Sequence, residues 1–170
     1  FDLVKNKAIS GYDPANVVTL MTSPLSGTLA PGASSRCEVQ GIGIQSYPIE
    51  WFTRSNFGGR FAAMLKFAGW DGVVIEGKAD APVWVDVRNR KVDIRDARDL
   101  WGLDTWQTQQ RIWKTVVGSD AAGKWNELSN GSQSTTQRPA VVAIGPAGEN
   151  LSRTACLIHD AGCASGQGGF

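Results

Sequence analysis

The sequence lacks an excess of charge of either sign, since 17 Lys and Arg face 16 Asp and Glu for a formal net charge of +1. A protein that binds nucleic acid needs a clustered cationic surface, and no block of Lys or Arg occurs here. No apolar run approaches the ~20 residues that cross a bilayer. We therefore expect neither nucleic-acid binding nor a membrane-spanning segment.

Cysteine and histidine are also scarce. Three Cys without a CxxC pair do not form a disulfide framework, which favours a reducing, cytoplasmic compartment. The single His, His159, lies between Cys156 and Cys163, and with Cys37 or Asp160 it offers a zinc ligand set. However, Cys156 and His159 would face opposite sides of an expected strand, so we favour small packed cysteines and a structural His.

The common catalytic and nucleotide-binding motifs are missing as well. The sequence has neither a GxSxG elbow nor a GxxxxGK[ST] loop, so a serine hydrolase and a P-loop protein have no support. No GxGxxG motif leads from a strand into a helix. Any cofactor bound by this chain must use another arrangement.

Glycine, by contrast, is abundant, with 20 Gly where an average chain of this length has about 12. Small residues gather at 23–28, 56–59 and 164–169, where the bare backbone can turn tightly or approach another group closely. Gly58 and Gly59 precede an expected helix, whose first N–H groups suit an anion. On the pattern alone, turns and helix caps remain the simpler interpretation.

Hydrophobic periodicity favours an α+β protein with antiparallel sheets over a Rossmann fold, because strands and helices do not alternate strictly. We expect strands at 17–21, 36–44, 47–53, 72–77, 139–144 and 153–159, a hairpin of 83–87 and 92–94 turned by Asn89-Arg90, and helices at 61–68 and 105–117. Asp104 and Gln107 form a potential capping box for the second helix, which would carry Trp106, Gln109 and Trp113 along one side. The polar stretch 121–137 is expected to be a surface excursion.

Four segments carry motifs that occur together in one known family. They are SPLSGT at 23–28 with APG at 30–32, SNFGGRF at 55–61 with LKFAGWDG at 65–72, IEGKA at 75–79, and IGPAGENL at 144–151. Their order and spacing resemble the N-terminal domain of the tungsten-containing aldehyde:ferredoxin oxidoreductase family. The resemblance covers nearly all of the chain, with the polar stretch 121–137 as the main unmatched part.

The resemblance implies a base of two mainly antiparallel β-sheets with a few flanking helices, supporting a tungsten bis-pyranopterin (tungstopterin) cofactor. Its phosphates would be bridged by Mg²⁺, held by the Asn56 side chain and the Ala164 carbonyl, which are the hard oxygen donors that Mg²⁺ prefers. Arg36 would lie at a phosphate or the pterin. The expected cofactor-binding set is Arg36, Asn56, Gly58, Gly59, Cys163, Ala164, Ser165 and Gly166. Cys163 and Gln167 stand where many relatives carry Arg.

The resemblance also implies that residues 1–170 are most of the N-terminal cofactor-binding domain of a longer polypeptide, truncated at both ends. That polypeptide would oxidise aldehydes to carboxylic acids and pass electrons through a [4Fe–4S] cluster to ferredoxin or an electron-transfer subunit. Three Cys cannot supply four thiolates, so the cluster ligands would lie outside this chain, which would hold no catalytic residue and be inert by itself. We expect the remaining domains as partners and a homo-oligomer. The alternatives are a related tungsten reductase subunit acting on aromatic thioesters and a non-enzymatic β-rich scaffold.

Overall fold

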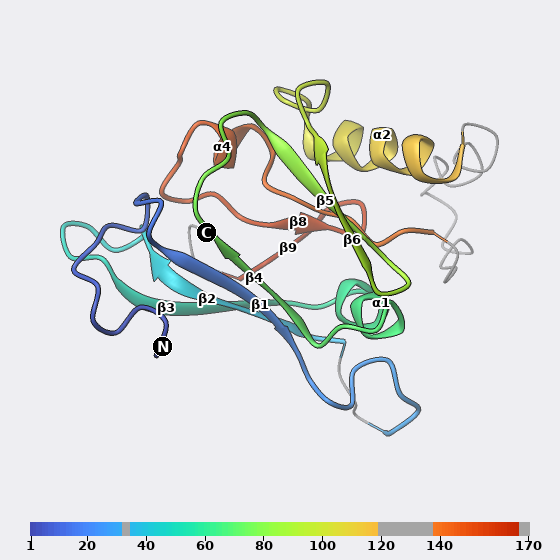
Figure 1. The fold of residues 1–170 in the computed structure, drawn as a ribbon, viewed down its shortest axis with the longest axis horizontal. Coiled ribbons are helices and arrows are strands. Elements are labelled where there is room, and N and C mark those ends of the chain that lie inside the picture. Colours follow the sequence, from blue (N-terminus) through green and yellow to red (C-terminus); the bar gives the residue numbers. More distant parts are fainter. Residues whose placement is uncertain (32–34, 119–137, 167–170) are drawn as a thin grey trace.

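The computed structural model describes residues 1–31, 35–118 and 138–166 and shows the expected α+β fold with antiparallel sheets (Figure 1). The elements are β1 (Val17–Thr22), β2 (Cys37–Gly43), β3 (Trp51–Phe57), α1 (Phe61–Phe67), β4 (Gly72–Glu76), β5 (Val83–Arg88), β6 (Lys91–Asp96), α2 (Thr105–Val117), β7 (Val142–Ala143), α4 (Gly145–Glu149), β8 (Ile158–His159) and β9 (Cys163–Ala164). The stretch 121–137 and Gln167 lie outside the described residues. No helix in the described ranges is long and apolar enough to span a membrane.

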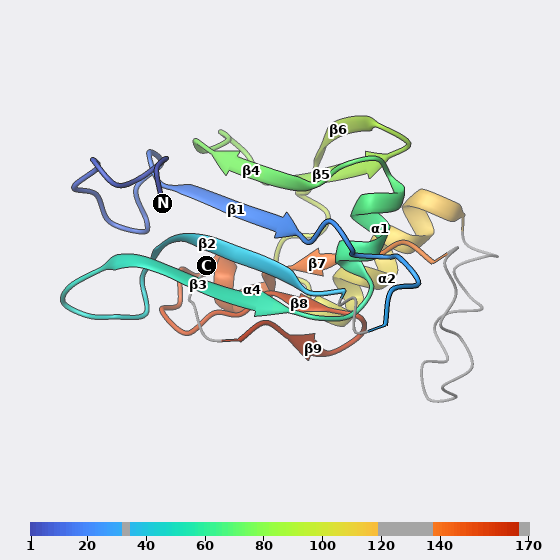
Figure 2. The same cartoon turned by 90° about the horizontal axis from the view of Figure 1, so that it is seen from below.

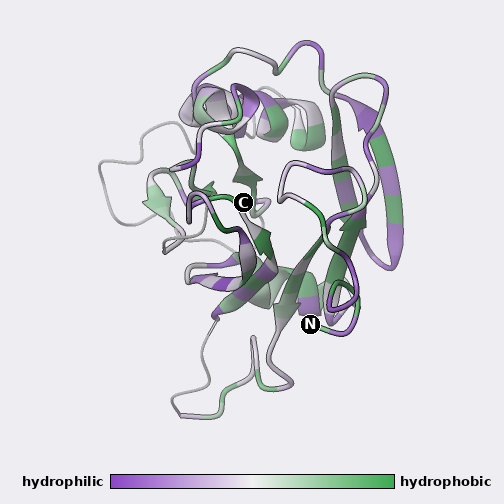
Figure 3. Ribbon diagram, turned by 90° about the vertical axis from the view of Figure 1, so that its left-hand side faces the viewer, coloured by the Kyte–Doolittle hydropathy of each residue, from purple (hydrophilic) through white to green (hydrophobic). Residues whose placement is uncertain are grey.

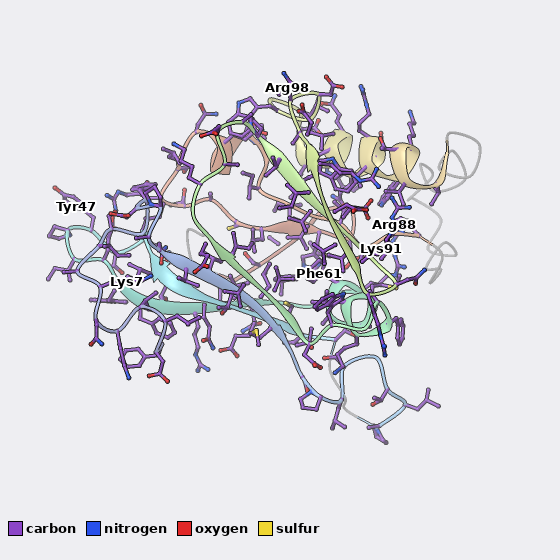
Figure 4. The ribbon with its side chains drawn as sticks, in the orientation of Figure 1. Lys7, Tyr47, Phe61, Arg88, Lys91 and Arg98 are labelled. Atoms are coloured by element: carbon purple, nitrogen blue, oxygen red, sulfur yellow. The ribbon has the colours of Figure 1, made fainter. Side chains whose placement is uncertain are left out.

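The largest sheet has the strand order β3-β2-β1-β4, and all of its neighbours are antiparallel. Its inner face buries Val39 and Phe57, which are 0% and 1% exposed, against Ala62 of α1 and Leu157. Phe61, at the start of α1 in Figure 4, tilts its ring onto that of Phe57 at 5.6 Å between centroids. The small sheet β7-β8-β9 lies next to β2 and β3 in Figure 2, so the core joins the two sheets.

The β5–β6 hairpin and α2 enclose a second core around Ile112, Trp113 and Val141. Residues of opposite hydropathy alternate along the hairpin strands, as the coloured bands of Figure 3 show. On the polar side, Asp86 is 6% exposed and forms ion pairs with Arg88 and Arg95. The Arg88 side chain, which hydrogen-bonds the carboxylate, holds the pKa of Asp86 below its usual value, and Arg95 adds to the effect. These charges satisfy a buried carboxylate next to Trp84, whose ring lies 5.3 Å from the Arg95 guanidinium.

Most of the expected elements are confirmed to within one or two residues, and the hairpin turn uses Asn89 and Arg90, both at positive φ. Three expectations are wrong in extent. The strand expected at 47–53 begins at Trp51, because residues 44–48 form a bend. The strand expected at 139–144 shrinks to β7, because the chain turns directly into α4 with Pro146 in its first turn.

The strand expected at 153–159 is also shorter than predicted, because only Ile158–His159 joins a sheet. Buried and less buried residues do alternate from residue 155 to residue 161. The alternation of apolar and polar residues in the sequence therefore predicted which side chains are buried, but not the hydrogen bonds that define a strand. Within α2 the buried residues are Gln109, Ile112 and Trp113, whereas Trp106 is 45% exposed.

The capping box of α2 gives a direct test of the fold. Asp104 Oδ1 accepts from the Gln107 N–H at 2.7 Å, and Gln107 Oε1 accepts from the Asp104 N–H at 3.2 Å. Asp104→Ala should destabilise the first turn by about 1 kcal/mol, which speeds amide hydrogen exchange there about five-fold. The exposed Asp80→Ala is the control, and equal exchange rates in the two variants would contradict the capping role.

Candidate functional site

The structure brings together three parts of the expected cofactor-binding set: Arg36, Asn56 and the segment 163–166. We call this group the junction. Arg36 leads into β2 and Asn56 lies near the end of β3, and the Arg36 guanidinium donates a hydrogen bond to Asn56 Oδ1. The Gly166 N–H donates to the Asn56 carbonyl at 3.0 Å. Asn56, Cys163 and Ala164 are exposed, so the junction opens to solvent.

The β2–β3 pairing explains why Asn56 faces outward. Glu38 pairs with Asn56, and on either side of this pair Cys37 faces Phe57 and Val39 faces Ser55. Because successive side chains point to opposite faces, the apolar residues of these flanking pairs fill the core while Asn56 points to solvent. Asn56, whose side chain the family resemblance implies as a metal ligand, is therefore exposed to solvent.

Ser165 has a different position from its neighbours, because it is 9% exposed and its side chain is used inside the protein. Its Oγ accepts from the Leu157 N–H at 3.1 Å, and its own N–H donates to the Leu157 carbonyl at 2.8 Å. These bonds extend the β8–β9 pairing, in which Ile158 faces Ala164 and His159 faces Cys163. The Ser165 side chain thus anchors the segment 163–166, while its neighbours Cys163, Ala164 and Gly166 stay exposed to solvent.

The two glycines before α1 have different surroundings. A Cβ added at Gly58 would meet no atom of the described chain within 4 Å, so the backbone there borders open space. A Cβ added at Gly59, where φ is +72°, would lie 1.8 Å from Asp160 Oδ2. The Cβ side of Gly58 is therefore open to another molecule, whereas the Cβ side of Gly59 is occupied by the Asp160 carboxylate.

Asp160 also occupies the start of α1, where the sequence suggested an anion. The Arg60 N–H donates to Asp160 Oδ2 at 2.9 Å, and His159 Nδ1 lies 2.9 Å from the same oxygen. His159 is 2% exposed and packs its ring against Phe57 at 5.0 Å. Sequence reasoning considered Asp160 only as a zinc ligand and missed this contact, because it joins residues 100 positions apart. The one local feature that pointed to a close approach was the glycine at position 59, but it did not indicate which residue approaches.

The zinc hypothesis has no geometric support in the structure. Within the described ranges, no three His, Cys, Asp or Glu side chains gather in a group that could hold a metal ion. All three cysteines are free thiols, and burial, with a smaller effect of Glu38, raises the pKa of Cys37 to about 12. A thiol with that pKa stays protonated at neutral pH and is a poor metal ligand.

The junction instead fits a cation that is shared with phosphate groups. Asn56 Oδ1 already accepts from a cationic group, the Arg36 guanidinium, in the position where Mg²⁺ is expected. Ala164 is exposed and lies two positions before Gly166, which bonds to Asn56, and the open side of Gly58 follows Asn56 by two positions. Neutral oxygen donors beside an Arg suit a metal whose charge is balanced by phosphates from a ligand.

Comparison with known proteins agrees with the sequence motifs. The family model described as "Aldehyde ferredoxin oxidoreductase, N-terminal domain" matches residues 1–170. A tungsten-containing aldehyde ferredoxin oxidoreductase of Pyrococcus furiosus is 36% identical over 95% of this chain and 23% of its own length. The protein of the same name from Thermococcus kodakarensis is 35% identical over 92% of this chain and 22% of its own length. The chain thus spans under a quarter of the length of these curated relatives.

Two other similar proteins carry different names. The WOR-like subunit of aliphatic sulfonate oxidoreductase from P. furiosus is 30% identical over 91% of this chain and 23% of its own length. Among solved structures, the active site complex BamBC of benzoyl coenzyme A reductase with 1,5-dienoyl-CoA gives a TM-score of 0.76 at 30% identity. That match covers 95% of this chain and 21% of the other.

The contrast between the two glycines predicts a contrast between two variants. Gly59→Ala should cost about 2 kcal/mol, because it places a side chain at positive φ and displaces the Asp160 carboxylate from Arg60. Gly58→Ala should change stability by a few tenths of a kcal/mol, because its side is open. Thermal unfolding of both variants measures the difference, and equal melting temperatures would contradict the assigned role of Gly59.

Proposed function

Because the chain belongs to the aldehyde ferredoxin oxidoreductase family as its N-terminal domain, we propose that it binds tungstopterin within an enzyme that oxidises aldehydes to carboxylic acids. The observation that carries this proposal is the meeting of Asn56 with the segment 163–166 at an exposed junction. The choice of cofactor is supported by the relatives, which are tungsten-containing aldehyde ferredoxin oxidoreductases. When bound, the cofactor would supply the two-electron chemistry of aldehyde oxidation.

In this proposal the chain's own residues hold and orient the cofactor. Asn56 Oδ1 and the Ala164 carbonyl would bind Mg²⁺ shared with the pterin phosphates. The Arg36 guanidinium, which already lies at Asn56 Oδ1, has the planar fork that suits a phosphate. Gly58 would let the cofactor approach the backbone closely. Cys163 would replace a cation with a small neutral side chain, which weakens the electrostatic attraction for the phosphates.

The rest of the enzyme would come from other parts of a longer polypeptide. We propose that residues 1–170 form most of its N-terminal domain, since the relatives are about four times longer. The ligands of a [4Fe–4S] cluster and the acid–base groups would lie in those other parts. Ferredoxin or an electron-transfer subunit would accept the electrons, and the assembly would be a cytoplasmic homo-oligomer.

A second candidate is a tungsten-dependent reductase subunit that acts on an aromatic thioester. The structural similarity to the benzoyl coenzyme A reductase complex favours it, and the WOR-like relative shows that the domain occurs in proteins with other names. The scaffold alternative finds no support, because the proteins compared are oxidoreductases.

The proposed Mg²⁺ ligand gives a test of cofactor binding. In the full-length protein, Asn56→Ala should reduce tungsten retention on the order of ten-fold, because it removes an oxygen that holds the phosphate-bridging metal. Tungsten and magnesium per chain are measured by mass spectrometry after gel filtration. Asn6→Ala, at an exposed turn, is the matched control and should keep the wild-type content. Equal metal contents in the two variants would refute the role of Asn56.

Activity assays separate the two candidate functions. We expect the purified protein to carry about one tungsten or molybdenum atom per chain and to reduce a viologen dye when an aldehyde is added. Reduction of an aryl-coenzyme A thioester without aldehyde oxidation would favour the second candidate. If protein from cells grown with tungsten and molybdenum contains neither metal, both candidate functions are excluded.

A further inference from the structure

We propose that Asp160 is a positioning residue that fixes the two halves of the junction relative to each other, an inference that rests on the proposed cofactor site. One half is the end of β3 with Asn56 and Gly58, and the other is the β8–β9 hairpin with the segment 163–166. These halves are distant in sequence and adjacent in space (Figure 2). A ligand set split between them requires their relative position to be held within about 0.5 Å.

The contacts of Asp160 connect the halves through a single oxygen atom. Oδ2 accepts the Arg60 N–H at 2.9 Å, next to Gly58 and Gly59 in the chain, and lies 2.9 Å from Nδ1 of His159 on β8. A carboxylate can only accept hydrogen bonds, so the N–H of this pair is on Nδ1 and donates a hydrogen bond to this oxygen. The Asp160 side chain is 16% exposed, which shields both bonds from competing water.

The backbone conformation of Gly59 makes room for the contact between Asp160 and Arg60. The carboxylate lies where a Cβ at position 59 would stand, and the positive φ of Gly59 turns the chain so that the Arg60 N–H faces the acid. We expect that Glu at position 160, which is one methylene longer, cannot keep its carboxylate in this place without displacing the turn. The length of the side chain is therefore expected to matter as well as its charge.

The turn that carries Asp160 is held from its other side as well. Asp160 and Ala161 have φ values of 40° and 71°, a left-handed conformation that L residues seldom adopt without support. The Ala161 N–H donates to Oε1 of Gln109, a residue of α2 that is 1% exposed. The turn is therefore tied to α1 through Asp160 and to α2 through Gln109, while Gly166 contacts Asn56 at the exposed end. Separate contact points fix the orientation of the hairpin as well as its distance from β3.

The experiment compares Asp160→Ala with Asp104→Ala in the full-length protein. Both variants remove an acid that accepts a backbone N–H at the start of a helix, but only Asp160 joins the β8–β9 hairpin to the residues that follow β3. The first measurement is amide hydrogen exchange of Gly166, whose N–H bonds to Asn56, in protein from cells grown without tungsten and molybdenum. The second is tungsten per chain in protein from cells grown with tungsten.

For Asp160→Ala we expect exchange at Gly166 to be at least five-fold faster than in wild type, and tungsten content to fall below half. Asp104→Ala should accelerate exchange in α2 only and keep its tungsten. Asp160→Asn should restore both readouts to within two-fold of wild type, because the amide oxygen can still accept the Arg60 N–H. If Asp160→Ala does not fold, Asp160→Glu replaces it and should show the same fast exchange, because its longer side chain cannot occupy the space over Gly59.

Wild-type exchange at Gly166 in Asp160→Ala, or in Asp160→Glu where that variant replaces it, would overturn the proposal. Where the wild-type protein binds tungsten, tungsten retention equal to that of Asp104→Ala would overturn it as well. The exchange measurement uses protein without cofactor, so it decides the positioning role even if wild-type protein never binds tungsten. In that case the proposed function fails, and fast exchange in Asp160→Ala still shows that Asp160 positions the hairpin.

Discussion

The pairing register of β2 and β3 is the constraint on which the candidate site depends. Cys37, Val39 and Phe57 are almost completely buried on one face of these strands, and Asn56 lies on the other. A slip of one residue would turn the apolar set toward water and bury the Asn56 amide. The free energy of burying the core therefore also determines that Asn56 is presented at the surface, next to Arg36 and the segment 163–166.

Residues within the glycine-rich segments next to this sheet have different roles, and the composition of the segments alone does not show which residue has which role. Gly58 borders open space, and Gly59 makes room for a carboxylate of the same chain. Ser165 lies within an otherwise exposed segment and bonds inward to Leu157. The cofactor-binding set that the motifs suggest thus divides into residues that can face a ligand and residues that hold those in place.

The sequence predicted best what short-range physics determines. The capping box of Asp104 and Gln107 and the turn at Asn89-Arg90 are local, and both are confirmed. The strand expected at 153–159 was wrong in extent because alternation reports burial, whereas a strand also needs a partner that only the fold supplies. The family motifs nominated Asn56 and Ala164, and the structure places their segments together. The contact of Asp160 with Arg60 could not be predicted, because no pattern of spacing connects residues so far apart.

The close approach of Asp160 to Gly59 has a consequence for how this domain can diverge. A side chain at position 59 and an acid at position 160 compete for one volume, so position 59 is restricted to glycine for as long as position 160 carries the acid. Homologues that gain a side chain at the first are expected to have lost the acid at the second and to close that hairpin by different means. Covariation of these two sites across an alignment would therefore record a steric exchange rather than shared contact with a ligand.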